Sequence, residues 1–211
     1  MTAKVHHDEM KYAIGQSVPR TEDPKLLRGD GQYTDDLTLR DQIYAAIVRS
    51  PLAHGIIKNI DTTEAETMPG VIAIFTGKDL SSYGNLPCGM QLKSKDGTPL
   101  KKPARPSLVT DKVRFVGDPV ACVIAETPEK AKDAAEIVFV DIDPLASTTT
   151  AREAAVHGAP NIYKDVQNNT ALDFHFGDHD AVNSAFKNAH HVSHLDIRNN
   201  RVVVASMEPR S

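Results

Sequence analysis

The stretch VRFVGDPVACVIAETPEKAKDAAEIVFVDIDP, residues 113–144, decides the fold, because it predicts a strand, a helix and a second strand in succession. Residues 117–119 are typical of a tight turn, and the apolar run 120–125 that follows has the length of a buried strand. Thr127, followed directly by a proline, marks the helix start. Pro144 ends the second strand, which begins where the helix stops.

The helix that Thr127 opens is expected to lie against a sheet along a face of small residues. Its apolar positions recur three and four residues apart, which places them on one side: Ala131, Ala134, Ala135 and Val138. Three apolar runs nearer the N-terminus predict further strands: 43–48, 55–60 and 71–75. Between the last two, Asp61 predicts the cap of a short helix, with Glu64 placed to reach back to it.

The two ends of the chain carry weaker patterns. Residues 1–20 indicate a mobile arm without hydrophobic periodicity, and residues 26–36 favour a turn-rich entry rather than a helix. Beyond Pro144, Thr150 predicts one helix start and Asp178 another, and residues 194–207 predict an extended segment. A tail with one amphipathic helix and one strand cannot bury its own core, so it must pack on the preceding part or belong to a larger unit.

Composition excludes several classes of protein. The 211 residues carry 24 Lys and Arg against 28 Asp and Glu, a net charge of −4, which argues against nucleic acid as the main partner. No apolar run approaches the ~20 residues that span a bilayer, and the N-terminus has no signal-peptide core. We therefore expect a cytoplasmic location and no membrane span. Cys88 and Cys122 are too few for a disulfide scaffold or an iron–sulfur site, and Cys122 lies in a run typical of buried strand.

Residues 81–114 form a long connection with four prolines and seven basic residues. Such a length is uncommon inside a compact domain unless the segment has a function. The basic part, 93–114, is interpreted either as a docking arm for a partner with an acidic surface or as a solvated excursion. The sequence leaves both alternatives open.

Spacing alone exposes no catalytic constellation. His190, His191 and His194 have helical metal-ligand spacing, but the helical pattern ends near residue 189. In an extended segment His190 and His194 share one side, and no second cluster supplies the remaining ligands. The acidic and histidine residues over 173–180 are expected in a loop and a helix cap. The pair Gly29 and Gly31 lacks the strand, helix and third glycine of a dinucleotide loop. No catalytic, cofactor-binding or metal-ligating residue is therefore assigned, and a small His-liganded metalloenzyme stays a minor alternative.

Six phrases, in order, carry a resemblance to a known family: 28–36 (RGDGQYTDD), 50–54 (SPLAH), 69–80 (PGVIAIFTGKDL), 113–121 (VRFVGDPVA), 134–138 (AAEIV), and 199–201 (NNR) leading to 207–210 (MEPR). Together they resemble the molybdenum-binding large subunit of the xanthine dehydrogenase/aldehyde oxidase superfamily, nearest its carbon-monoxide-dehydrogenase-like bacterial branch. Each phrase alone is weak, and six in order make a specific match.

The resemblance implies an α+β fold with a flexible N-terminal arm over 1–20 and an α/β hammerhead domain over 21–145. Residues 146–211 would then be a linker and the first helix and strand of an incomplete molybdopterin-binding domain. Glu208 and Arg210 match the phrase that opens that domain and are expected to form a buried structural pair. The apolar segment 202–207 stops without a polar cap, which favours a truncated chain or a tightly bound partner.

The resemblance also implies a function. Members use oxygen derived from water to hydroxylate a carbon centre of an aldehyde or an N-heterocycle, or they oxidise carbon monoxide. The cofactor, molybdenum-molybdopterin cytosine dinucleotide, would sit in the missing C-terminal part. The [2Fe-2S] clusters and FAD would belong to partner chains or domains, so the implied partners are an iron-sulfur small subunit, an FAD-binding medium subunit and the rest of the molybdenum-binding subunit. This chain alone would be inactive and its substrate stays open. The alternative is a stand-alone, non-catalytic interaction or scaffold protein with a hammerhead fold.

Overall fold

A computed structural model describes residues 15, 19–197, 199 and 202 of the chain. Residues 41–195 form one compact unit, and residues 19–40 belong to another. Within 19–40 the structure has a short helix α1 (Asp23–Leu27) and a single turn of 3-10 helix, η2 (Thr34–Asp36). The expected turn-rich entry over 26–36 agrees with the structure apart from Leu26 and Leu27, which end α1. Helix α1 itself was not predicted; a proline lies in its first turn, and the Asp23 carboxylate accepts from the Arg20 amide at 2.9 Å.

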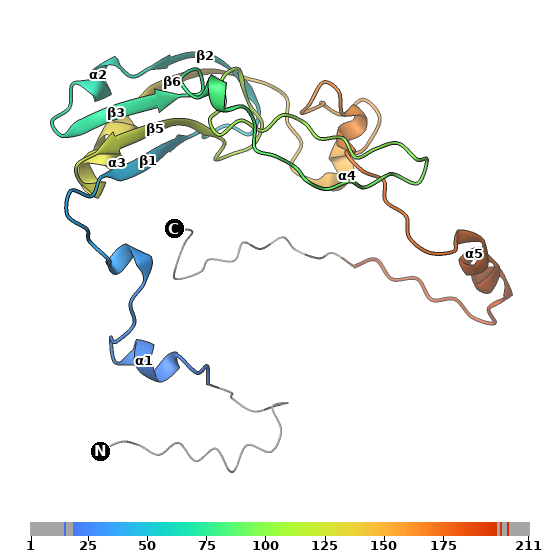
Figure 1. The fold of residues 1–211 in the computed structure, drawn as a ribbon. Helices are drawn as coiled ribbons and strands as arrows, with labels where there is room; N and C mark the ends of the chain where they lie inside the picture. The colour runs from blue at the N-terminus through green and yellow to red at the C-terminus, as the bar shows by residue number, and fades with distance from the viewer. Residues whose placement is uncertain (1–14, 16–18, 198, 200–201, 203–211) are drawn as a thin grey trace, which may run out of the picture. The chain divides into compact units, whose positions relative to one another are not determined.

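The 113–144 stretch supplies the central strand of one sheet and an edge strand of the other (Figure 1). The first sheet has the order β1 (Tyr44–Arg49), β5 (Pro119–Ala125), β3 (Val71–Thr76), with both pairings antiparallel. β5 is central and has four fully buried residues on its two faces: Val120, Ala121, Val123 and Ala125. The continuous apolar run that predicted this strand reflects that burial on both faces.

The second sheet has the order β4 (Lys112–Val113), β2 (Gly55–Asp61), β6 (Phe139–Pro144), again antiparallel. β2 pairs along its length with β6, with a register shift between Ile57 and Asn59 of β2. β4 pairs only with Gly55 and Ile56, the first two residues of β2. All the strands predicted between residues 43 and 144 are therefore confirmed, and with them the mixed α+β fold class.

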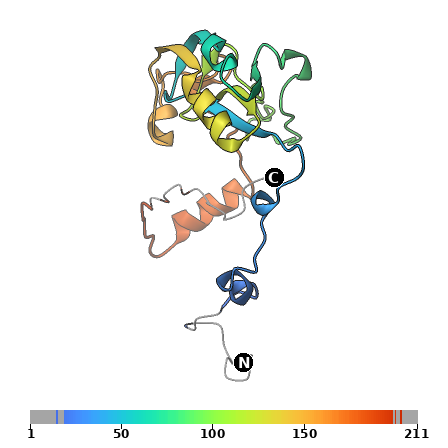
Figure 2. The ribbon, with the colours of Figure 1, turned by 90° about the vertical axis from the view of Figure 1, so that its left-hand side faces the viewer.

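Helix α3 (Pro128–Ile137) lies against the first sheet, as the spacing of its small residues predicts (Figure 2). The Thr127 side chain caps it by accepting from the Lys130 amide at 3.3 Å, and Ala131 and Ala134 are buried. Helix α2 (Thr63–Glu66) is a single turn. The Asp61 carboxylate accepts from the Thr63 amide at 3.0 Å, so Asp61 caps the start of the helix as predicted. The predicted reciprocal contact from Glu64 is not formed; the carboxylate in this turn that accepts a hydrogen bond is that of Glu66, from the Thr62 hydroxyl.

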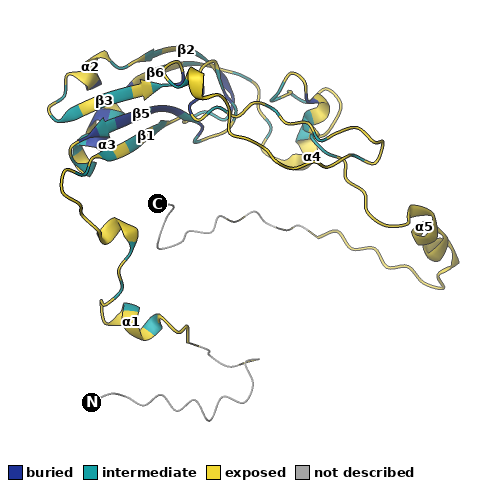
Figure 3. Cartoon of the chain, in the orientation of Figure 1, coloured by how far each residue is buried: buried dark blue, intermediate teal, exposed yellow. Residues whose placement is uncertain are grey.

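The core consists of two clusters that join the sheets and helices (Figure 3). One contains buried side chains of α2, α3 and β5: Ala65, Ala121, Val123, Ala134 and Val138. The other contains Val109, Val113 and Val120, with Ile57 and Ile142 packed against it. Burying a valine fully contributes about 1.5–3 kcal/mol relative to exposure, so these few residues account for much of the stability of the unit.

Beyond β6 the structure has short helices separated by loops. They are α4 (Ala151–Ala154), the 3-10 turn η4 (Gln167–Asn169) and α5 (His179–Asn188). Earlier in the chain, the 3-10 turn η3 (Ser81–Tyr83) begins the long connection 81–114. Thr150 and Asp178 cap α4 and α5, as predicted. The predicted extended segment 194–207 lies mostly outside the described residues, as do Glu208 and Arg210. In the part of the chain that the structure describes, no helix is long and apolar enough to cross a membrane.

Candidate functional site

Two of the phrases that carry the resemblance, 50–54 and 113–121, meet in space at one end of β1 and β5. The Ser50 amide donates to the Asp118 carbonyl at 2.9 Å, and the Gly117 amide donates to the Ser50 carbonyl at 2.8 Å. Arg49 adds a hydrogen bond from Nη1 to the Gly117 carbonyl at 2.9 Å. Gly117 has a φ of +91°, which L side chains rarely adopt, so the tight turn predicted at 117–119 is confirmed and needs its glycine.

Asp118 is a buried carboxylate inside this turn, with 5% of its surface exposed. Its Oδ2 accepts a hydrogen bond from the Arg114 amide at 2.8 Å. Burial raises the pKa of the Asp118 carboxyl above its ordinary value, and the hydrogen bond from Arg114 with the positive charges of Arg114 and Arg105 opposes part of that rise. The carboxylate thus closes the 114–118 turn.

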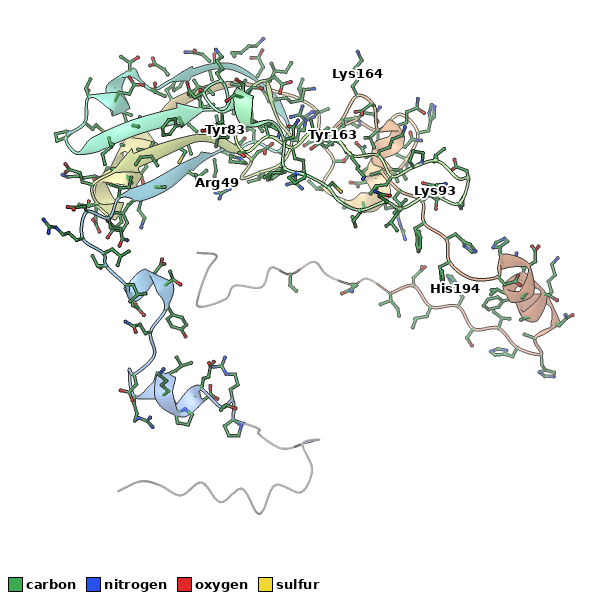
Figure 4. All side chains as sticks on the ribbon, in the orientation of Figure 1. Arg49, Tyr83, Lys93, Tyr163, Lys164 and His194 are labelled. Atoms are coloured by element: carbon green, nitrogen blue, oxygen red, sulfur yellow. The ribbon has the colours of Figure 1, made fainter. Side chains whose placement is uncertain are left out.

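Arg114, in this turn, lies over the ring of Tyr163. Tyr163 belongs to the segment after β6 and is labelled in Figure 4. The guanidinium carbon lies 5.0 Å from the ring centroid, within the range of a cation–π contact. Nη1 donates to the Lys112 carbonyl at 2.9 Å, while the buried Nε has no hydrogen-bond partner. The contact lines a small cavity of about 80 Å³ together with Asp118 and Phe115. Periodicity along the chain could not have shown it, because Arg114 precedes β5 whereas Tyr163 follows β6.

His54 connects the other phrase to the same later segment. Its Nδ1 lies 2.7 Å from the Ala146 carbonyl, and the Leu145 amide donates to the His54 carbonyl at 2.9 Å. Since a carbonyl only accepts, Nδ1 carries the proton, and the buried Nε2 has no hydrogen-bond partner. His54 therefore holds the chain where it leaves β6, a role that the sequence did not indicate.

Two larger cavities adjoin each other beside the sheets. One, of about 450 Å³, lies between β2 and the end of β3. The other, of about 340 Å³, shares Gly77, Thr110 and Asp111 with it. Lys58 in the first cavity is paired with Asp143 at 2.8 Å. Neither cavity brings a nucleophile beside a base, so neither has the arrangement of a catalytic site.

The histidines do not form a metal site among the residues that the structure describes, where no three His, Cys, Asp or Glu groups come together. His175 and His179 meet edge to face with centroids 5.6 Å apart, and the His191 ring pairs with the Ser193 hydroxyl at 3.1 Å. Cys88 is exposed, and Cys122 in β5 is free and half-buried.

Gly77, the glycine that lines both larger cavities, does not offer a cradle for the phosphates of a molybdopterin cofactor. A phosphate cradle needs glycines that a ligand can approach closely. A Cβ placed at Gly77 would lie 2.6 Å from the Leu108 carbonyl, so the protein itself fills that space, while Gly84 and Gly117 stand open in surface turns.

The long basic connection is an ordered two-stranded excursion, which we call the ribbon (residues 84–106). Its two sides are joined by hydrogen bonds from the Leu86 amide to the Arg105 carbonyl at 2.8 Å and from the Leu100 amide to the Leu92 carbonyl at 2.9 Å. Its tip packs along residues 171–173, where Lys95 donates to Asp173 through its amide at 2.9 Å and pairs with the Asp173 carboxylate at 2.7 Å.

Comparison with protein families gives one match over more than half of the chain. Residues 28–146 match the model for the aldehyde oxidase and xanthine dehydrogenase a/b hammerhead domain. The matched range contains the two sheets, α2, α3, the ribbon and the 50–54 and 113–121 phrases.

Individual proteins are similar over a wider range. The nicotine 6-hydroxylase large subunit of Paenarthrobacter nicotinovorans is 36% identical over 202 residues, 95% of this chain and 24% of that protein. The carbon monoxide dehydrogenase large chain of Afipia carboxidovorans is 33% identical over 159 residues, 75% of this chain and 18% of that protein. The crystal structure of quinoline 2-oxidoreductase from Pseudomonas putida 86 superposes with a TM-score of 0.60 at 34% identity, covering 72% of this chain and 19% of that one. The chain thus spans about a quarter or less of the length of these relatives.

Proposed function

The chain belongs to the aldehyde oxidase and xanthine dehydrogenase family and contains its α/β hammerhead domain, and we propose that it is the N-terminal portion of a molybdenum hydroxylase large subunit. The observation that carries the proposal is the extent of the match to such a subunit. Similarity to the nicotine 6-hydroxylase large subunit covers 95% of this chain, well beyond the hammerhead domain itself.

The proposed activity of the assembled enzyme is oxidation of a small substrate with oxygen taken from water. Nicotine and quinoline, named in two of the relatives, are N-heterocycles, and the third relative is named for carbon monoxide. These names support an N-heterocycle or carbon monoxide as the substrate class, and the family name, aldehyde oxidase and xanthine dehydrogenase, adds an aldehyde. A bound molybdenum-molybdopterin cytosine dinucleotide would supply the oxygen transfer, with [2Fe-2S] clusters and FAD on partner chains or domains as the electron path.

The contribution of this chain is structural. We propose that residues 21–145 act as the hammerhead domain and that residues 146–211 begin the molybdopterin-binding domain. Helix α5 supports this division, because its apolar residues Val182 and Phe186 are 52% and 60% exposed in the structure. An amphipathic helix of this kind needs a partner surface for its apolar face. The residues that bind the cofactor and act on the substrate would lie in the remaining length of the large subunit.

The test is co-production of the 211-residue chain with the proposed partners: a remaining large-subunit polypeptide, an iron-sulfur small subunit and an FAD-binding medium subunit. Reduction of an artificial electron acceptor is then measured with an aldehyde, an N-heterocycle and carbon monoxide. We expect turnover with one substrate class by the assembled complex and none by the chain alone. Turnover by the isolated chain would contradict the proposal. Failure of every combination to assemble or turn over would favour the non-catalytic scaffold instead.

A further inference from the structure

The segment between β6 and α5 has little regular secondary structure, yet it is fastened to the preceding fold at three places. His54 holds its start through the Ala146 carbonyl. Arg114 lies over the Tyr163 ring midway along it. At its end, residues 171–173 are bonded to the tip of the ribbon. Three separate parts of the preceding fold therefore hold one later segment.

A single side chain, that of Asn169, closes the middle of this segment into a loop. Its Oδ1 accepts from the Ile162 amide at 2.8 Å, and its Nδ2 donates to the Ala154 and Pro160 carbonyls at 2.9 and 3.0 Å. Asn169 has a φ of +51°, a left-handed conformation that Asn tolerates better than most residues with a side chain. Both polar groups of its amide are thus used to fix the backbone over 154–169.

The closed loop also buries an apolar side chain. Val166 is 4% exposed, the same fraction as Val109 in the core. Its amide donates to the Tyr163 carbonyl at 3.1 Å, and its carbonyl accepts from the Asn169 amide at 3.3 Å. A segment that buries an apolar residue and pairs its own backbone has the features of a folded structure rather than of a flexible linker.

The ribbon tip holds the end of the segment from both of its sides. The Lys101 amide donates to the Ala171 carbonyl at 3.0 Å. From the other side, the Ser94 hydroxyl accepts from the Asp173 amide at 3.2 Å. The Lys95–Asp173 ion pair is exposed and by itself contributes little. The hydrogen bonds to the backbone therefore set the register of this contact.

These contacts end at Asp173. Residues 174–177 are exposed, and they form no hydrogen bond with any residue that the structure describes. Gly177 has a φ of +111°, and the position that a Cβ would take there has no neighbour within 4 Å. Helix α5 begins directly afterwards, capped by Asp178. The chain thus changes from a fixed to an unsupported segment within a few residues.

We propose that residues 145–173 form a strap that is a fixed part of the hammerhead fold, and that the chain articulates over 174–177. Asn169 closes the strap, and the ribbon clamps its end. The long basic connection then has a role inside this chain, which is to hold residues 171–173. The inference concerns contacts within the chain and does not depend on the proposed function. Within residues 146–211, α5 is then the first element free to pack in another domain.

The rival is a flexible linker that becomes ordered only when the rest of the subunit is present. Amides in such a linker exchange with solvent at nearly the rate of an unstructured chain, whereas amides in a folded strap are protected. The two alternatives therefore differ in the isolated 211-residue chain, where no partner can order the segment.

Hydrogen exchange of the full chain, measured by mass spectrometry of its peptides, separates the two. We expect the amides over 154–173 to exchange more slowly than those over 174–177 by about tenfold or more, after correction for intrinsic rates. The ribbon amides over 92–101 should show protection similar to that of the strap, because hydrogen bonds join the two segments.

Asn169→Ala tests the closure of the strap, with Asn168→Ala as its matched control. Asn168 lies in the same turn with a φ of +49°, so both variants place alanine in a left-handed conformation. The Asn168 side chain is exposed and forms no hydrogen bond with a described residue. Loss of three hydrogen bonds should make Asn169→Ala speed exchange over 154–169 about tenfold or more, and Asn168→Ala should change it by less than about threefold.

The double variant Ser94→Ala, Asp173→Asn tests the clamp. It removes the hydroxyl acceptor and the ion pair but keeps the amide donors of the ribbon. Exchange should become about threefold faster or more over 171–173 and stay unchanged over 154–162. Unchanged exchange over 119–125, which is β5, checks that each variant has folded.

Three results would overturn the proposal. Exchange over 154–173 as fast as over 174–177 in the natural chain would show a flexible linker. Equal effects of Asn169→Ala and Asn168→Ala would assign the cost to the backbone turn rather than to closure by the side chain. Protection that continues through 174–177 would place the articulation elsewhere. None of these measurements involves molybdenum, so the proposed function is tested separately.

Discussion

The guanidinium carbon of Arg114 lies 5.0 Å from the centroid of the Tyr163 ring, and this contact joins the turn before β5 to the segment that follows β6. With the His54–Ala146 hydrogen bond, it fixes the first part of the chain after Pro144 on the hammerhead fold. The strand–helix–strand stretch and its continuation are therefore held together at two separate points.

Tyr163→Ala should lower the free energy of unfolding by about 1–2 kcal/mol, because it removes the ring under a guanidinium whose side chain is only 19% exposed. Tyr163→Phe keeps the ring face and should cost less than half as much. Urea unfolding followed by far-UV circular dichroism measures both. Equal losses in the two variants would show that the hydroxyl, rather than the ring face, carries the stabilisation.

Asp118→Asn should change the pH dependence of stability. Burial raises the pKa of the Asp118 carboxyl in the folded chain above its ordinary value, so the folded state holds this proton more tightly than the unfolded state. The contribution to stability is present below the ordinary carboxyl pKa of about 4 and is lost as the pH rises through the folded pKa. The stability of the Asn variant relative to the natural chain should therefore increase with pH in that window.

Urea unfolding of the natural chain and Asp118→Asn at several pH values between 3 and 7 measures this difference. Glu129→Gln is the control, because its carboxylate is exposed at the start of α3 and its pKa is lowered by hydrogen bonds to its own amide and Thr127. Its relative stability should change with the opposite sign. A parallel response of the two variants would contradict the assignment.

His54→Ala should destabilise the chain by about 1–3 kcal/mol, because it removes a buried hydrogen bond and leaves the Ala146 carbonyl without its donor. His54→Asn, whose amide can donate to the same carbonyl, should recover part of the loss. Hydrogen exchange of the amides over 145–150 provides the second readout, and faster exchange confined to that segment is expected. Unchanged exchange there would mean that His54 does not hold the exit from β6.

Limited proteolysis should release the C-terminal part of the chain while residues 41–144 resist. We expect the first cleavages within 174–197, where every residue is exposed, and later ones within 146–173, where contacts with the ribbon and Arg114 hold the backbone. Mass spectrometry of the fragments gives the order. Equal resistance along the chain would favour a complete, self-contained protein.

The strands and α3 were predictable from sequence because their evidence is local. Continuous apolar runs marked β1, β2, β3 and β5, and Thr127 with the following proline marked the start of α3. Helix α1 was missed since it is one short amphiphilic turn with no buried residue, and its only marker is a proline at its start.

The contacts that hold the later segment were not predictable. Arg114 and Tyr163, like His54 and Ala146, are brought together by the topology, and no periodicity relates them. The amphipathic pattern of α5 predicted a helix correctly, but what covers its apolar face depends on neighbours outside its own sequence. The ribbon was recognised as unusual from its charge and length, whereas its ordered pairing with residues 171–173 required the structure.

The molybdenum content of the purified protein tests the central claim most directly, measured by elemental analysis on the isolated 211-residue chain and on the complex assembled with its large-subunit remainder and partner subunits. The account predicts no molybdenum in the isolated chain and equimolar molybdenum in the complex. Equimolar molybdenum in the isolated chain, or none in a fully assembled complex, would contradict it.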